Sequence, residues 1–225
     1  MARRAMTSAA ASAVKRTGHA REHLFAGLIG GEVIKGTGKA DIRRGDETWS
    51  VKSGTWAQIF LYRETAAAAL GVAFHDCIKA FPDKRDDYVD DKSKHKMALQ
   101  QPMRALCAHL SDIENLEAFL HRVMFADSID HLVIMKGNKF LEFKAGDVVR
   151  ALVSSILVKN SKARNKKQMD DQKVIFRLEG VKKALGEIEI RTDSAAHYRE
   201  LKCRFNVPML RDFLESRCAV NEYLV

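Results

Sequence analysis

Long hydrophobic runs are missing from this sequence. No apolar stretch approaches the roughly 18 residues that a membrane helix needs, because charged residues interrupt the longest candidates within a few positions. Proline is scarce, with 3 residues in a chain of 225, while 46% of the residues are hydrophobic. This composition is typical of a globular domain. It predicts a soluble, cytoplasmic protein that has no membrane partner.

Patterns that would hold zinc, a disulfide framework or a nucleotide phosphate are also missing. The four cysteines are scattered, with no CxxC pair and no histidine at zinc-finger spacing. The 8 histidines include no HxH or HExxH pattern. The sequence GTGKAD at residues 36–41 lacks the spacing and the downstream hydroxyl of a phosphate loop. These absences argue against a zinc protein, a disulfide-stabilised protein and a nucleotide-binding protein. The scattered cysteines also fit a reducing compartment.

Positive charge is what the chain has in surplus. It contains 38 Lys and Arg against 29 Asp and Glu, for a net charge of +9 and a pI of about 9.4. Such a surplus suits a polyanionic partner, because neutralised phosphates release counterions. Residues 1–21 contain no acid, a composition shared with organelle transit peptides. We expect instead a mobile basic arm over residues 1–16, or a first helix close to DNA phosphates.

The order of sequence patterns predicts one α/β domain over residues 1–225, with a mixed central β-sheet flanked by helices. Helical patterns predict helices over residues 17–29, 56–81, 97–124, 146–160 and 207–219. β-branched and aromatic runs predict strands within residues 32–42, 47–52, 131–144, 173–178 and 186–193. Residues 83–96 and 161–172 are rich in charge and predict a mobile connection and a basic loop.

The stretch GKADIRRGDETWSVKSG, residues 38–54, has the pattern of a polar hairpin. If Gly45-Asp46 forms a two-residue turn, Asp41, Ser50 and Lys52 project from one face, because side chains alternate along a strand. The opposite face then receives an apolar, core-facing set, Ile42, Trp49 and Val51. A three-residue loop would separate Asp41 from Lys52, whereas a four-residue loop restores the arrangement. The alternative is a structural surface hairpin with a cross-strand ion pair and no catalytic role.

This pattern resembles the PD-(D/E)xK nuclease superfamily, which includes most type II restriction endonucleases. In that family an aspartate and a second acid hold Mg²⁺, a backbone carbonyl often completes the site, and a lysine positions or deprotonates the attacking water. The resemblance implies that Asp41 is a metal ligand, Val51 the carbonyl donor and Lys52 the lysine. It implies that Glu22, on the preceding helix, is an accessory acid. The resemblance covers about residues 20–64.

Ser50 departs from the family pattern, which usually has Asp or Glu at that position. Some restriction enzymes with serine there recruit a glutamate from the following helix, and Glu64 is the candidate in this chain. A phosphodiester resists hydrolysis because its charged oxygens repel a nucleophile, so a carboxylate-held Mg²⁺ and a nearby ammonium would assist. Mg²⁺ needs only one or two carboxylates. The lost acid is therefore tolerable if another one reaches the site.

A second hairpin also fits the family motif, with Asp130 followed by Glu142 and Lys144. A turn at Gly137-Asn138 would place Asp130 on the opposite face from Glu142 and Lys144, so the three groups would not converge. A β-bulge near Asp130 would reverse that outcome. This hairpin remains the alternative site.

Several basic residues are candidate DNA contacts, in the first hairpin, in the basic loop and near the predicted strand 186–193. They are Arg43, Arg44, Lys162, Arg164, Lys166, Lys167, Arg191 and Arg199. A solvated loop and an amphipathic strand at a sheet surface are the alternative interpretations of the same residues.

Together these patterns predict a Mg²⁺-dependent double-stranded DNA endonuclease that cuts at a specific site, as a type II restriction enzyme does. Cutting both strands of a palindrome suggests a homodimer, because two-fold protein symmetry matches the site. The alternatives are a repair or junction-resolving nuclease of the same superfamily, and a non-catalytic nucleic-acid-binding protein.

Overall fold

The computed structural model describes residues 8–35, 39–62, 70–166 and 168–225. Two candidate site residues, Glu64 and Lys167, lie outside these ranges. The described part of the predicted basic arm is helical, because the first helix begins at Ser8.

The N-terminal half of the chain supplies one long helix, four strands and a group of helices. In chain order these are α1 (Ser8–Ile29), β1 (Glu32–Val33), β2 (Ile42–Arg44), β3 (Glu47–Lys52), β4 (Trp56–Tyr62), α3 (Val72–Lys79), α4 (Arg85–Asp90), α5 (Lys92–Ser111), α6 (Ile113–Leu120) and a π-helical turn η1 (His121–Phe125).

Strands dominate the C-terminal half. The elements are β5 (His131–Lys136), β6 (Lys139–Lys144), α7 (Ala145–Val153), β7 (Ile156–Asn160), β8 (Lys173–Leu178), β9 (Gly186–Ile190), a 3₁₀ turn η2 (Ala195–His197), β10 (Leu201–Asn206), α8 (Val207–Glu215) and β11 (Asn221–Leu224).

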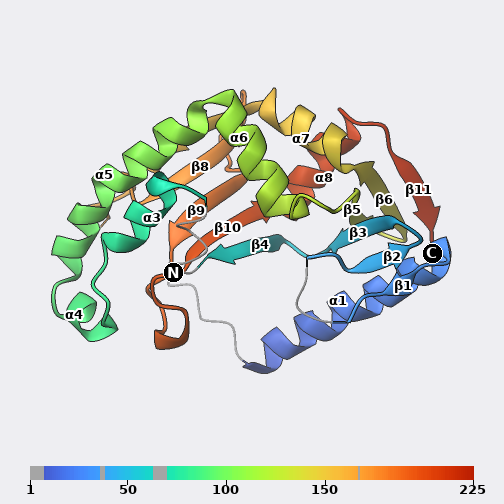
Figure 1. The fold of residues 1–225 in the computed structure, drawn as a ribbon, viewed down its shortest axis with the longest axis horizontal. Helices are drawn as coiled ribbons and strands as arrows, with labels where there is room; N and C mark the ends of the chain where they lie inside the picture. The colour runs from blue at the N-terminus through green and yellow to red at the C-terminus, as the bar shows by residue number, and fades with distance from the viewer. Residues whose placement is uncertain (1–7, 36–38, 63–69, 167) are drawn as a thin grey trace.

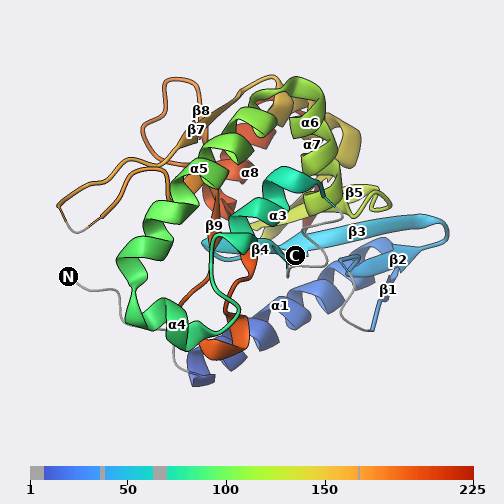
Figure 2. The ribbon, with the colours of Figure 1, turned by 60° about the vertical axis from the view of Figure 1, so that its left-hand side comes forward.

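The described strands form two sheets, so the α/β class is confirmed but the prediction of one central sheet is wrong. The first sheet has the order β1-β2-β3-β5-β6-β11, and it is mixed because β3 and β5 are parallel. The second has the order β4-β10-β9-β8-β7 and is antiparallel. The helix α1 lies along the first sheet, while α5, α6 and α7 arch over the molecule (Figure 1). Turning the molecule shows the β7–β8 connection extending from the edge of the second sheet, away from β2 and β3 (Figure 2).

The first sheet is buried on both of its faces. On one face, α1 packs Phe25, Ala26 and Ile29 against a small cluster that includes Trp49 and Val133. On the other face the strand residues Leu132, Ile134, Leu141 and Phe143 join the main core, which continues beneath the second sheet. Burial of this apolar area is the main favourable contribution to folding, at about 25 cal/mol per Å². The β2–β3 hairpin is therefore held against a packed layer.

The predicted register of the first hairpin is confirmed. Ile42 pairs with Trp49 and Arg44 pairs with Glu47, so the turn contains two residues. Gly45 has a φ of +59°, a left-handed conformation that glycine adopts without a Cβ penalty. The predicted register of the second hairpin is also confirmed, because His131 pairs with Lys144.

The predicted helix over residues 56–81 is wrong in its first part, because Trp56–Tyr62 is strand β4, which pairs with β10. Later in this range the structure describes residues 70–81, where helix α3 extends over Val72–Lys79. In residues 56–62, sheet pairing with a strand far along the chain overrides the local helical pattern. The predicted helix over residues 146–160 is likewise divided, because it ends at Val153 and Ile156–Asn160 pairs with β8.

Residues 83–96 were predicted to be a mobile connection, but they contain α4 and the first turn of α5. Tyr88 of α4 is buried, and the Asp91 side chain caps α5 by accepting a hydrogen bond from the Lys94 amide. Strands β10 and β11 were not predicted at all. Both carry charged residues, which obscure their apolar alternation.

Candidate active site in the first hairpin

One carboxylate oxygen of Asp41 accepts hydrogen bonds from three of the predicted site residues. Its Oδ2 accepts hydrogen bonds from the Val51 amide at 2.7 Å and the Ser50 hydroxyl at 3.2 Å, and from the Lys52 ammonium at 3.4 Å. These three donors come from consecutive residues of β3, and Asp41 lies directly before β2. The even hairpin register therefore brings Asp41, Ser50 and Lys52 together as the sequence predicted.

The second oxygen of Asp41 is available. Among the described residues, no group donates a hydrogen bond to Oδ1, while Oδ2 receives three. The side chains of Asp41 and Lys52 are 20% and 21% exposed. Partial exposure lets a small ligand or a metal ion reach the carboxylate, while the hydrogen bonds to Oδ2 fix its orientation.

The carbonyl of Val51 lies on the same side of β3 as Asp41. The Val51 N–H donates to Asp41, and the carbonyl of Trp49, two residues earlier, accepts from the Asp41 amide at 2.8 Å. The N–H and C=O of one strand residue point toward the same neighbouring strand. Val51 can therefore offer a backbone oxygen beside the Asp41 carboxylate.

Lys39 belongs to the surroundings of this site but was not among the predicted site residues. Its ammonium donates to the carbonyls of Val123 at 2.8 Å and Arg122 at 3.2 Å, which are in η1. Burial lowers the pKa of Lys39 to about 8, and repulsion from Lys52 acts in the same direction. The contact ties the segment before Asp41 to η1. Its signal in the sequence, a lysine two residues before the aspartate, is too common to be informative.

Of the two candidate accessory acids, Glu22 and Glu64, only Glu22 lies within the described residues. Glu22 lies on α1 three residues before the buried Phe25, so it is on the sheet-facing side of the helix, and its side chain is 16% exposed. Its Oε2 contacts His19 Nδ1 at 2.9 Å. It makes no hydrogen bond to Asp41 or Lys52. Glu64 lies outside the described residues.

The donor chemistry of the hairpin suits Mg²⁺. Asp41 Oδ1 and the Val51 carbonyl are hard oxygens, and Mg²⁺ binds through one or two carboxylates while keeping several waters. Within the described ranges, no three His, Cys, Asp or Glu side chains gather into a group that could hold a metal. Asp41 and Val51 are thus the residues that could hold the ion, together with any accessory acid.

The alternative hairpin does not converge on a site. Asp130 Oδ2 accepts from the Thr48 amide at 2.8 Å and hydroxyl at 3.0 Å. Glu142 is 4% exposed and instead accepts hydrogen bonds from Tyr223 at 2.8 Å, Asn221 at 3.0 Å and the Trp49 indole. The two carboxylates therefore serve different structural contacts.

Glu142 stays ionised in this buried position. Burial opposes its ionisation, but the hydrogen bonds from Trp49, Asn221 and Tyr223 outweigh that effect and hold the pKa of Glu142 below its ordinary value. His131 stacks on Trp49 with ring centroids 4.9 Å apart, and its Nδ1 lies 3.2 Å from Glu142. This arrangement anchors β11 and β3 to the central strands.

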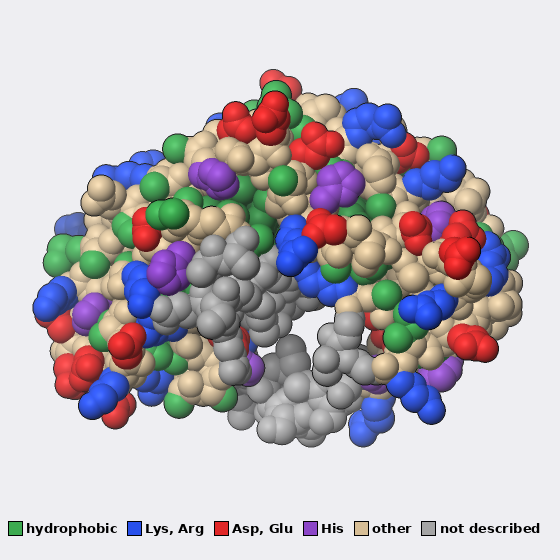
Figure 3. Space-filling view, in the orientation of Figure 1, with side chains coloured by type: hydrophobic (Ala, Val, Ile, Leu, Met, Phe, Trp, Pro, Cys, Tyr) green, Lys and Arg blue, Asp and Glu red, His purple; other side chains and the backbone are tan. Residues whose placement is uncertain are grey.

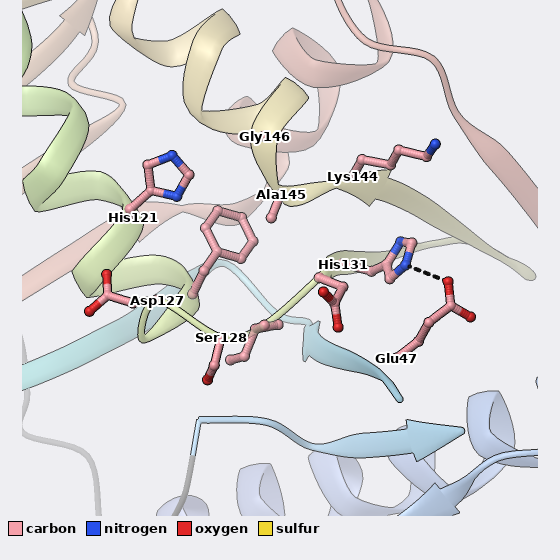
Figure 4. A pocket seen from close by; sticks show the side chains of 11 residues that line it. Glu47, His121, Asp127, Ser128, His131, Lys144, Ala145 and Gly146 are labelled. Carbon is pink, nitrogen blue, oxygen red and sulfur yellow. Dashed lines mark hydrogen bonds and ion pairs between the residues drawn. The ribbon is translucent and has the colours of Figure 1, made fainter. Parts of the chain in front are cut away.

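A cavity of about 440 Å³ lies beside that hairpin (Figure 4). His121, Asp127, His131 and Lys144 are among its lining residues, and the dashed line in the figure marks the contact between His131 and Glu47. The side chains of His121, Asp127 and Lys144 extend in different directions instead of meeting at one point (Figure 4). Among the described residues that line this cavity, no three His, Cys, Asp or Glu side chains form a group that could hold a metal ion.

Three of the predicted DNA-contacting arginines are engaged within the protein. Arg44 pairs with Glu47 at 2.9 Å, Arg191 contacts Asp193 at 3.2 Å, and Arg199 pairs with Asp83. A DNA contact by any of them would compete with an existing ion pair.

The other predicted contacts that the structure describes are exposed. Arg43 is on β2, while Lys162, Arg164 and Lys166 lie in the β7–β8 loop, where Lys162 pairs with Asp170 at 3.4 Å. Lys and Arg side chains also border a central hollow of the molecule in the space-filling view (Figure 3).

Comparison with known proteins adds no relative. No protein-family model, curated protein or solved structure matches the chain. Every helix in the described ranges is too short or too polar to cross a membrane.

Proposed function

We propose that this protein is a Mg²⁺-dependent endonuclease that hydrolyses phosphodiester bonds in double-stranded DNA, acting at specific sites as a type II restriction enzyme does. The observation that carries the proposal is the convergence of the Val51 amide, the Ser50 hydroxyl and the Lys52 ammonium on Asp41 Oδ2, with Oδ1 left open. The resemblance to the PD-(D/E)xK superfamily supplies the chemical interpretation of these residues.

Each residue has a distinct role in the proposed reaction. Asp41 Oδ1 and the Val51 carbonyl would hold Mg²⁺, which when bound neutralises charge on the phosphate and lowers the pKa of a water molecule. Lys52 places a positive charge beside the reacting phosphate, and it orients the attacking water. The water oxygen forms a new P–O bond and releases a proton to solvent, one ester P–O bond breaks, and the leaving oxygen takes up a proton. Ser50 orients Asp41 through its hydroxyl.

Ser50 leaves one ligand position to be supplied from elsewhere. Glu22 is the described candidate, because it lies on the face of α1 that packs against the hairpin sheet. Glu64 is the second candidate. One carboxylate with several waters is also a known arrangement for Mg²⁺.

Two active sites related by a two-fold axis match the symmetry of a palindrome and would cut both of its strands. We therefore propose that the protein acts as a homodimer on its substrate.

The test is incubation of supercoiled plasmid with the protein, either with Mg²⁺ or with a chelator. Discrete linear fragments only with Mg²⁺ support a restriction enzyme, while a metal-dependent smear supports a less specific nuclease, such as a repair enzyme. Lys52→Ala should abolish cleavage, and Lys35→Ala, a lysine in the segment before the hairpin, is the matched control. DNA binding without cleavage, over a range of sequences and metals, would overturn the proposal.

A further inference from the structure

A second surface of the molecule has the properties of a polyanion site. A groove of about 1580 Å³ lies over the second sheet and extends from Trp56, at the start of β4, to the β7–β8 loop. Lys and Arg far outnumber Asp and Glu among the residues that line it. This groove is separate from the hydrogen-bonded group around Asp41, because none of Asp41, Ser50 and Lys52 lines it.

The strand pairing of the second sheet places several charged side chains on one face, which lines the groove. Ile175 of β8 pairs with Lys159 of β7 and with Glu187 of β9, and Glu187 pairs with Arg204 of β10. Directly opposite residues share a face, so these four side chains form a row across the sheet. Arg177 is two residues from Ile175 and lies on the same face. The neighbouring residues Val174 and Phe176 point into the main core.

The acids in the groove are already neutralised by neighbouring bases. Asp171 pairs with Arg104 at 2.6 Å, and Glu187 with Lys173 at 3.1 Å and with Arg204. Glu189 contacts Lys173 and Lys202. Burial opposes ionisation of Glu189, but Lys173 and Lys202 hold its pKa below the ordinary value, so it remains a charged partner for them. The acids therefore fix several bases in place without cancelling the overall positive charge.

Five exposed bases of the groove have no acidic partner among the described residues. They are Lys159 and Arg177 on the sheet face, Lys182 and Lys183 in the β8–β9 loop, and Arg164 in the β7–β8 loop. Unpaired positive charges that line one concavity focus a positive potential, which attracts a polyanion.

We propose that this groove binds the phosphate backbone of double-stranded DNA, and that it holds the substrate while the Asp41 site cuts. The inference rests on the proposed function for the identity of the polyanion. Trp56, which lines the groove, follows Lys52 by only four residues in the chain, so one end of the groove is close in sequence to the Asp41 site.

Duplex DNA is favoured over a single strand by the aromatic residues of the groove. Single-strand sites stack bases on exposed rings. Here the Arg204 guanidinium covers the Trp56 ring at 4.7 Å, and Phe81 and Tyr88 are each 4% exposed. Charge is accessible in the groove whereas stacking surface is covered, as suits contacts to the backbone of a duplex.

The test is the affinity for a labelled duplex, measured by fluorescence anisotropy in chelator over a series of salt concentrations. Two variants change the groove, Lys182→Glu with Lys183→Glu, and Lys159→Glu with Arg177→Glu. The control, Arg150→Glu with Arg217→Glu, makes the same charge change at exposed residues outside the groove. Each lost phosphate contact should weaken binding on the order of tenfold at about 0.1 M salt and reduce the slope of log K against log salt by about 0.9.

The outcomes distinguish DNA binding by the groove from DNA cleavage by the proposed active site. Weaker binding by both groove variants, with the control unchanged and all proteins folded by circular dichroism, supports the inference even if no variant cuts DNA. Equal affinity of wild type and groove variants overturns it without affecting the proposed active site. Tighter binding of wild type to single-stranded DNA or RNA than to the duplex overturns the assignment to double-stranded DNA.

Discussion

The Lys52 ammonium lies 3.4 Å from Asp41 Oδ2, across a hairpin whose strands are joined by a two-residue turn. The same register buries Trp49 and Ile42 on the opposite face. Core packing and the candidate site therefore depend on one backbone alignment, and a shift of one residue would lose both.

Replacing Ser50 with aspartate should make the stability of the protein depend on metal. Ser50 is 1% exposed and its hydroxyl contacts Asp41, so a second carboxylate there would repel the first. We expect Ser50→Asp to lower the melting temperature in chelator and Mg²⁺ to restore much of the loss. Thermal unfolding with and without Mg²⁺ measures this, with Ser53→Asp as the control. An equal loss in both conditions would argue against a cation between these two positions.

The turn glycine should be hard to replace with a β-branched residue. Gly45 has a φ of +59° and a Cβ would meet open space, so the cost of substitution is backbone strain rather than a clash. We expect Gly45→Val to destabilise the fold by about 1–2 kcal/mol and Gly45→Asn to cost less. Urea unfolding of the two variants measures the difference. Equal stabilities would mean that the turn does not have the left-handed conformation.

Glu142 should make the protein less stable in acid. Because its folded pKa lies below the ordinary 4.5, its contribution is fully present above pH 4.5 and is lost as pH falls through the folded pKa. Glu142→Gln should cost about 2 kcal/mol or more at pH 7, because three donors lose a charged acceptor.

The measurement is urea unfolding of wild type and Glu142→Gln at pH 7 and at about pH 3.5. The stability gap between them should narrow at the lower pH. A gap that is constant across this range would show that Glu142 does not titrate differently in the folded and unfolded states.

Lys144 should not contribute to cleavage. It pairs with His131 across the second hairpin, is exposed, and makes no contact with Asp130 or Glu142. Lys144→Ala should retain the plasmid cleavage rate of the wild type, whereas Lys52→Ala should lose it. The reverse result would move the active site to the second hairpin.

The geometry of the first hairpin was predictable because its information is local. A two-residue turn between alternating apolar and polar residues has one register that buries Ile42, Trp49 and Val51, and that register determines where Asp41 and Lys52 point. The roles of Glu22 and Glu64 depend on how separate elements pack, which no local pattern specifies.

Two strands of the second sheet, β8 and β9, were predicted from the sequence, whereas β4, β7 and β10 were not. In β10, Lys202 and Arg204 pair with Glu189 and Glu187 of β9 on the outer face, and these charges obscure the strand pattern. Trp56–Tyr62 precedes an alanine-rich segment and is a strand because β10 pairs with it. Long-range pairing of this kind is outside the range of sequence periodicity.

The most direct measurement compares plasmid cleavage by wild type, Asp41→Asn and Asp46→Asn at saturating Mg²⁺. Asp46 lies in the turn of the same hairpin, is exposed and makes no contact with the site, so Asp46→Asn is matched in charge and location. We expect metal-dependent cleavage by wild type and Asp46→Asn, and a loss of about 10³-fold or more in Asp41→Asn. Cleavage by Asp41→Asn at the wild-type rate would show that Asp41 is not part of an active site.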